Sequence, residues 1–180
     1  MESVQTLKTK TFDVLKDKLD LKNVSQSPVL QKIVISVGTG RIDDRNKIAL
    51  IQDRLAKITG QKPAPCKARK SIAAFKLRQG DVIGYKVTLR GDRMFHFFDK
   101  LVHLALPQTR DFRGLKTSTV DDMGNCTIGI REHTIFPETS DEELKDVFGL
   151  SVTIVTSANS KKEAELLLRY LGLPLQKDGR

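Results

Sequence analysis

Apolar and polar residues alternate in four segments of the chain, which is the pattern of strands that bury one face. The four segments cover residues 30–38, 82–90, 126–132 and 150–157. In the first segment Ile33, Ile35 and Val37 fall on one face, with Lys32 and Ser36 on the other. The outward residues of all four segments are mostly short and polar or basic, so the pattern predicts strands with one buried face.

Apolar residues at helical spacing predict four helices, over about 3–20, 44–59, 92–105 and 161–171. The second helix is expected to be capped by Asp43 or Asp44 and to stop at Gly60. The third is expected to be capped by Asp92 and to end at Pro107. The last is expected to begin with a capping box of Ser160 and Glu163 and to end before Gly172. The end of the chain, from Gln176 to Arg180, has no such pattern and is expected to form a loose tail.

Strands and helices interleave along the chain, and every predicted strand has only one apolar face. This arrangement predicts an α+β fold, in which an open, mostly antiparallel sheet has helices packed on one face. The other face is expected to be free and to carry Lys, Arg, Thr and Ser side chains. With 180 residues, the chain is expected to form a single domain over residues 1–180, with an N-terminal helix and a short C-terminal tail.

The positive charge is concentrated in one window. The formal net charge is +9, and residues 61–115 contain twelve basic and four acidic residues, a net +8. A local positive field attracts polyanions, which makes nucleic acid the first candidate partner. An anionic membrane is a weaker candidate, because the densest basic stretch has the pattern of a loop and a strand and not of an amphipathic helix. A basic face that is merely solvated is the remaining alternative.

Signatures of catalysis, metal binding and export are missing from the sequence. Cys66 and Cys126 form no CxxC motif, which favours a reducing cytoplasm. There is no phosphate-binding loop, signal peptide or apolar run of the ~18 residues that span a bilayer. A magnesium-dependent nuclease would need acidic residues such as Asp121, Asp122 and Glu132, but turns and helix starts explain these more simply. We therefore expect no enzyme, cofactor or metal site.

Several longer blocks of sequence resemble one family. They are KITGQKP (57–63), ARKSIAAFKLRQGDVIGYKVTLRGDRM (68–94), LPQTRDFRGL (106–115), GN (124–125) and IFPE (135–138). Together they closely resemble the bacterial form of large-subunit ribosomal protein number five, over residues 7–174. The resemblance implies a non-catalytic, cytoplasmic constituent of the ribosome with an RNA-recognition-like fold.

The resemblance also implies binding of 5S rRNA in the central protuberance through the sheet face. The matching positions are Lys32, Ser36, Gln61, Lys86, Thr88 and Arg90. Ser36 stands where family members commonly have Asn, and a Ser hydroxyl cannot present both ends of an amide.

Further partners implied by the resemblance are 23S rRNA, neighbouring large-subunit proteins, the P-site tRNA and small-subunit head protein number thirteen. The loop 73–80 matches the family's tRNA-contacting loop, with candidate residues Phe75, Lys76 and Arg78. From the residues alone, Phe75 could stack on a base or pack back into the core. Segments 110–115 and 137–145 match the bridge to the small subunit, with candidate residues Arg110, Asp111, Phe112, Arg113 and Glu138. The alternative function is a free RNA-binding protein or RNA chaperone, which would need the basic window but not segments 110–115 and 135–138.

Overall fold

The computed structural model describes residues 4–42, 44–110, 112–139 and 146–176 of the chain. The chain divides into two compact units, each built from separate stretches of sequence. Unit 1 comprises residues 1–33, 89–128 and 153–180, and unit 2 comprises residues 34–88 and 129–152.

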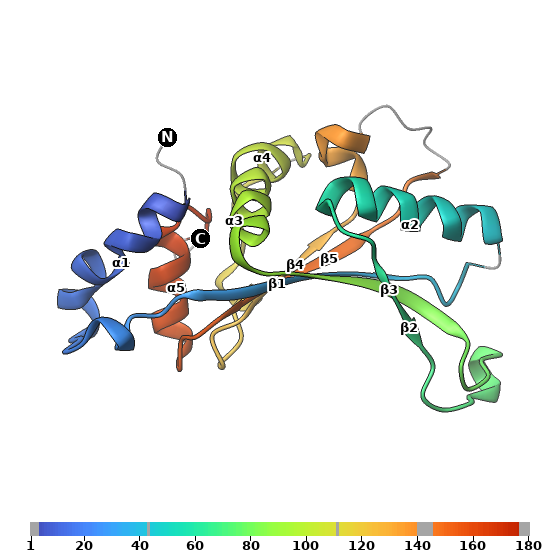
Figure 1. Cartoon of the computed structure of the whole chain (residues 1–180), viewed down its shortest axis with the longest axis horizontal. Coiled ribbons are helices and arrows are strands. Elements are labelled where there is room, and N and C mark those ends of the chain that lie inside the picture. Colours follow the sequence, from blue (N-terminus) through green and yellow to red (C-terminus); the bar gives the residue numbers. More distant parts are fainter. Residues whose placement is uncertain (1–3, 43, 111, 140–145, 177–180) are drawn as a thin grey trace. The chain divides into compact units, whose positions relative to one another are not determined.

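Five strands form one sheet in the order β2-β3-β1-β5-β4. They are β1 (Leu30–Gly38), β2 (Ala64–Lys67), β3 (Val82–Leu89), β4 (Cys126–Ile130) and β5 (Leu150–Thr156). The predicted α+β fold with an open antiparallel sheet is confirmed (Figure 1). In β1, β4 and β5 the buried residues alternate with more exposed ones, as the sequence pattern predicts.

Strand β2 has no strand pattern in the sequence and was not predicted. It is a short edge strand that pairs antiparallel with β3, and its four residues are exposed or half-buried, so they show no apolar alternation. It contains Pro65 and follows Pro63. Proline lacks a backbone N–H and is tolerated in sheets at edges, which explains how a proline-rich segment pairs here.

Three helices pack together in unit 1: α1 (Val4–Leu19), α3 (Gly91–Lys100) and α5 (Lys161–Tyr170). Helix α1 contacts both α3 and α5. The hydroxyl of Tyr170 donates to the carbonyl oxygen of Leu7 over 3.1 Å, and the backbone N–H of Val4 donates to the carboxylate of Asp99 over 3.3 Å. Burial of Val4 and Leu15 completes this part of the core.

Helix α3 differs from its prediction at both ends. Its N-cap is Arg90, and Asp92 lies in the first turn, where its charge still favours the helix dipole. The helix continues as a π-turn, η3 (Leu101–Ala105), and then as α4 (Leu106–Gln108), so it passes Pro107. Pro107 follows the π-turn directly, at the start of α4, and has no backbone N–H to donate there. The predicted cap and the predicted stop were therefore wrong.

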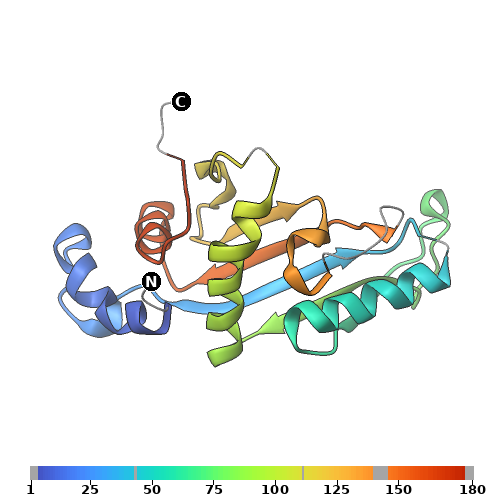
Figure 2. The same ribbon diagram turned by 90° about the horizontal axis from the view of Figure 1, so that it is seen from above.

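Helix α2 (Arg45–Thr59) belongs to unit 2 and buries Ile51, Leu55 and Ile58. Asp44 caps it by accepting from the backbone N–H of Asn46 over 2.8 Å, while Asp43 lies outside the described residues. Gly60 ends the helix in the left-handed conformation with φ 66°. In Figure 2, α2 lies over the strand segments of its own unit.

The remaining short helices are η1 (Val24–Gln26), η2 (Ala73–Phe75), η4 (Thr117–Thr119), η5 (His133–Ile135) and η6 (Pro137–Thr139). In the predicted capping box of α5, Ser160 accepts from the backbone N–H of Glu163, but the Glu163 carboxylate accepts from Asn159 and not from Ser160. Gln176, the first residue of the predicted tail, is hydrogen-bonded to Leu115.

None of the described helices has the length and hydropathy to cross a membrane.

Candidate nucleic-acid interface

Strand β3 places its polar residues on the opposite face from its buried ones. Val87 and Leu89 are buried, whereas Lys86 is exposed and Thr88 half-buried. This is the period-two alternation of a strand with one covered face. Lys86 is therefore accessible to a partner, as the sequence pattern predicts.

Gly84 brings β3 and β1 close together next to Lys86. A Cβ built on Gly84 would lie 2.6 Å from the carbonyl oxygen of Val37, a distance that real Cβ contacts do not reach. Only glycine fits without moving one of the two strands. Gly84 thus sets the spacing between the strands that carry Ser36 and Lys86.

Ser36 has a partner within its own unit. Its hydroxyl lies 2.8 Å from the hydroxyl of Ser151, and both side chains are half-buried. The two serines join β1 to β5 through their side chains. Ser36 therefore forms part of a hydroxyl pair and does not stand alone on the strand.

Gln61 is positioned by the end of helix α2. The Thr59 hydroxyl donates to the carbonyl oxygen of Leu55 over 2.6 Å, and it also accepts from the backbone N–H of Gln61 over 3.3 Å. Together with the left-handed Gly60, this turn directs the chain from α2 toward β2, and leaves Gln61 half-buried. Lys32 and Arg90 belong to unit 1, where Lys32 is half-buried and Arg90 exposed.

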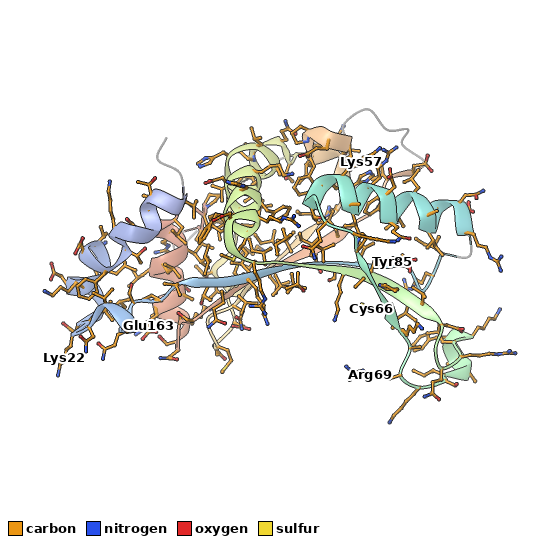
Figure 3. All side chains as sticks on the ribbon, in the orientation of Figure 1. Lys22, Lys57, Cys66, Arg69, Tyr85 and Glu163 are labelled. Carbon is orange, nitrogen blue, oxygen red and sulfur yellow. The ribbon has the colours of Figure 1, made fainter. Side chains whose placement is uncertain are left out.

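Positive charge gathers on the hairpin of β2, η2 and β3. We call residues 62–86 the basic hairpin; its exposed cations are Lys62, Lys67, Arg69, Lys70, Lys76, Arg78 and Lys86. Asp81 is its single acidic residue, and its carboxylate accepts from the backbone N–H of Arg78 over 2.8 Å. Within the described part of the chain, no ion pair neutralises these cations. Figure 3 shows Arg69 on this hairpin and Lys57 apart from it, on α2.

The tip of the basic hairpin presents apolar surface beside its cations. Phe75 is 67% exposed and Ile72 43% exposed. A bridge between Ile72 and Leu77 closes the tip, and Lys76 takes a left-handed conformation with φ 52°. Of the two alternatives for Phe75, the exposed position is the one observed.

The candidate bridge residues belong to two different units. In unit 1, Arg110 and Arg113 are exposed and Phe112 half-buried, while Asp111 lies outside the described residues. In unit 2, Glu138 is exposed in η6. Residues 140–145 of the second candidate segment also lie outside the described part of the chain.

Hydrogen bonds from the C-terminal segment hold the end of the first bridge segment. Leu115 donates to Pro174 and accepts from Gln176, each over 2.8 Å. The Gln176 side chain donates to the carbonyl oxygen of Arg113 over 3.2 Å, and Arg169 donates to the carbonyl oxygen of Gln176 over 3.2 Å. Residues 113–115 are therefore fixed by the C-terminal segment of unit 1.

Two features of the structure were not identified from the sequence. In unit 1, the hydroxyls of Thr127 on β4 and Thr153 on β5 lie 3.2 Å apart. In unit 2, the buried ring of His133 stacks on Phe148 at 4.0 Å, and its Nδ1 accepts from the backbone N–H of Phe148 over 3.3 Å. The outward position of both threonines follows from the strand alternation, but their pairing depends on register between strands.

The acidic turn considered for a magnesium site has a structural role. The Asp121 carboxylate accepts from the backbone N–H of Asn125 over 2.6 Å and lies 3.2 Å from its side-chain nitrogen. Among the described residues, no group of three or more His, Cys, Asp or Glu side chains is placed to hold a metal ion. Burial raises the pKa of the Cys126 thiol, and this keeps Cys126 protonated as a core residue.

Two family models match the chain in succession. The model described as "Ribosomal protein L5" matches residues 23–78, and the model that describes the C-terminus of the same ribosomal protein family matches residues 82–175. The first match contains the start of the basic hairpin and the second contains β3, β4 and β5.

Curated relatives are similar over nearly their whole length. The chain is 48% identical over 163 residues to the large ribosomal subunit protein uL5 of Anaeromyxobacter sp. (strain K), covering 90% of this chain and 91% of the relative. It is 49% identical over 164 residues to the uL5 of Moorella thermoacetica, with 90% and 91% coverage. It is 47% identical over 161 residues to that of Halothermothrix orenii, with 89% and 90% coverage. The chain therefore belongs to the ribosomal protein L5 family in its bacterial form, a family of structural, non-enzymatic ribosomal proteins.

Proposed function

We propose that this chain, a structural constituent of the large ribosomal subunit in the cytoplasm, binds 5S rRNA in the central protuberance through the open face of its sheet. The observation that carries the proposal is the position of Lys86 and Thr88 on β3, outward from the buried Val87 and Leu89. A cation and a hydroxyl on an uncovered strand are suitable donors for phosphate and 2′-hydroxyl groups.

Recognition of RNA by this face depends on shape and backbone contacts. The major groove of A-form RNA is too deep and narrow for side chains to read, whereas phosphates and 2′-hydroxyls are accessible. Lys86, Lys32 and Arg90 supply positive charge, and Ser36, Gln61 and Thr88 supply neutral hydrogen-bonding groups. Affinity then falls steeply with salt, by roughly a hundredfold or more between 50 and 200 mM if about five phosphates are neutralised.

The tip of the basic hairpin contacts the P-site tRNA in this proposal. Phe75 supplies an exposed aromatic face, and Lys76 and Arg78 supply exposed charge. An aromatic side chain between cations can stack on a base or ribose while the cations neutralise phosphates. The other cations of the hairpin are available to 23S rRNA.

The bridge to small-subunit head protein number thirteen involves Arg110, Phe112 and Arg113 on one unit and Glu138 on the other. The fixed backbone of residues 113–115 supports this role, because a preorganised segment loses less conformational entropy on binding a protein partner. Neighbouring large-subunit proteins contact the remaining surface.

A salt titration of 5S rRNA binding tests the proposal. The variant Lys86→Gln/Arg90→Gln is expected to weaken binding and to reduce the slope of log affinity against log salt by roughly two, one for each lost phosphate contact. The matched control Lys57→Gln/Lys162→Gln removes the same charge from α2 and α5 and is expected to leave the slope unchanged.

A second variant separates the two RNA contacts. Lys76→Gln/Arg78→Gln at the hairpin tip is expected to bind 5S rRNA normally and to reduce the retention of P-site tRNA by reconstituted ribosomes. If the control pair weakens 5S rRNA binding as much as Lys86→Gln/Arg90→Gln does, the open face is not the binding surface. A salt-independent affinity of the wild-type chain would also contradict the proposal.

A further inference from the structure

We propose that the hydroxyl pair of Thr127 and Thr153, on the open face of β4 and β5, binds ribose 2′-hydroxyl groups and so makes the interface selective for RNA over DNA. This inference rests on the proposed binding of 5S rRNA to the sheet. It adds specificity-determining residues on two strands that carry none of the candidate site residues.

The pair lies entirely in unit 1 and is accessible. Thr127 is exposed and Thr153 half-buried, while Ile128 and Ile154, the next residues of each strand, are buried. The two side chains therefore point away from the covered face. Their Oγ1 atoms lie 3.2 Å apart, so one threonine donates to the other across the two strands.

The hydrogen-bonding capacity of this pair matches a 2′-hydroxyl. A hydroxyl has one donor and two lone pairs, so the bond between the threonines leaves one O–H and several lone pairs for a ligand. A ribose 2′-hydroxyl also donates and accepts, whereas a phosphate oxygen accepts only. The pair can thus satisfy a 2′-hydroxyl in both directions, which a single Lys or Arg cannot do.

The electrostatic setting favours ribose over phosphate. Neither β4 (Cys126–Ile130) nor β5 (Leu150–Thr156) contains a charged residue, and both strands lie wholly within the described chain. Phosphate contacts are strengthened by charged donors, which β3 offers at Lys86 and these strands do not. A surface of uncharged hydroxyls can satisfy the hydrogen bonds of the neutral sugar edge but cannot neutralise a phosphate.

The short side chains of the pair allow a close approach. A threonine hydroxyl is attached directly to Cβ, and Thr127 is exposed, so a ribose can come within hydrogen-bonding distance. In unit 2, taken by itself, Ser36 and Ser151 form a second hydroxyl pair at 2.8 Å.

Binding assays with chemically altered RNA test the inference. The protein variant is Thr127→Val/Thr153→Val in the full chain, because valine keeps the shape of threonine and removes the hydroxyl. The RNA probes are 5S rRNA and the same RNA with 2′-fluoro groups at the positions that wild-type protein protects. Fluorine keeps the sugar pucker of RNA but cannot donate a hydrogen bond. Ser25→Ala/Ser118→Ala, which removes two exposed hydroxyls outside the sheet, is the control.

Wild-type protein and the serine control are expected to bind the 2′-fluoro RNA about tenfold more weakly than 5S rRNA, in keeping with the loss of two neutral hydrogen bonds. The threonine variant is expected to bind 5S rRNA about tenfold more weakly than wild-type protein and to discriminate less between the two RNAs, because only the hydroxyls outside the pair remain. Its salt slope is expected to equal that of wild-type protein, since no phosphate contact is lost.

Equal binding of both RNAs by wild-type protein overturns the inference, and this measurement does not require the variant to fold. A threonine variant that discriminates between the RNAs as strongly as wild-type protein overturns it as well. If wild-type protein fails to bind 5S rRNA at all, the proposed function fails together with the inference. Salt-dependent binding without discrimination leaves the proposed function intact and removes only the inference.

Discussion

Substitution of Gly84 by alanine tests whether the close approach of β1 and β3 controls the stability of unit 2. The new Cβ would lie 2.6 Å from the carbonyl oxygen of Val37 and 3.5 Å from its carbonyl carbon. Ordinary Cβ contacts begin at 3.4 Å, so one backbone must move by about 0.8 Å. No flexible side chain is available to absorb this movement, because the obstructing atoms are main chain.

The expected cost follows from two opposing effects. Overpacking of a well-packed interior costs about 1–3 kcal/mol, while alanine restricts the unfolded chain and returns about 0.4–1 kcal/mol. The net expectation for Gly84→Ala is a loss of about 1–2 kcal/mol. For a chain of this length, each kcal/mol corresponds to about 2–4 °C in melting temperature, so Tm falls by about 2–8 °C.

Gly129→Ala is the matched control, because Gly129 also lies in a strand of unit 2 and has open space at its Cβ position. At Gly129 alanine meets no obstruction and only restricts the unfolded chain. This variant is therefore expected to be as stable as wild-type protein or slightly more stable. Thermal and urea unfolding monitored by circular dichroism measures both variants.

Equal stability of the two alanine variants would refute the reasoning, since the two sites differ mainly in the obstructing carbonyl. The Gly84→Ala variant is also expected to bind 5S rRNA more weakly, because the displacement separates the strand of Ser36 from that of Lys86. Normal binding by a destabilised variant would show that strand spacing matters for the fold and not for the interface.

The remaining three predictions concern His133 and the two cysteines. His133→Phe keeps an aromatic ring against Phe148 but removes the nitrogen that accepts from the backbone N–H of Phe148. Urea unfolding is expected to show a loss of about 1–3 kcal/mol in the free energy of unfolding. An unchanged unfolding midpoint would contradict this. In the native protein, iodoacetamide is expected to modify the half-buried Cys66 before the buried Cys126, as peptide mass spectrometry would show. Because burial raises the pKa of Cys126 above its ordinary value of 9.0, the unfolded chain loses this proton first. The contribution of Cys126 to stability is therefore complete below about pH 9 and is lost as the pH rises through the folded pKa. Preferential labelling of Cys126 over Cys66 would refute the burial of Cys126 in the native protein.

Local periodicity was sufficient to predict most of the fold. A strand with one covered face repeats every two residues, so the outward position of Lys86 and Thr88 could be predicted from the sequence alone. Edge strand β2 could not be found in this way, because neither of its faces is buried. The π-turn at 101–105 was also missed, since it changes the helical period within a continuous apolar pattern.

Pairing between distant residues could not be predicted from local patterns. The hydroxyl bond between Ser36 and Ser151 depends on which strands are neighbours and in which register, and one sequence does not contain this information. His133 stands alone in the sequence, yet it is held by Phe148 on another segment. Whether Phe75 is exposed or buried could not be predicted for the same reason, because an aromatic residue in a loop fits the core and the surface equally well.

The interleaved composition of the two units has a consequence for synthesis. Unit 2 needs no residue after 152, whereas unit 1 includes α5 and the hydrogen bonds that join Leu115 to Pro174 and Gln176. A nascent chain grows at about 5–20 residues per second and folds in the order in which its parts emerge. Unit 2 therefore has its full complement of residues while unit 1 is still incomplete, and the segment around Leu115 gains its hydrogen-bond partners only after residue 176 has been added.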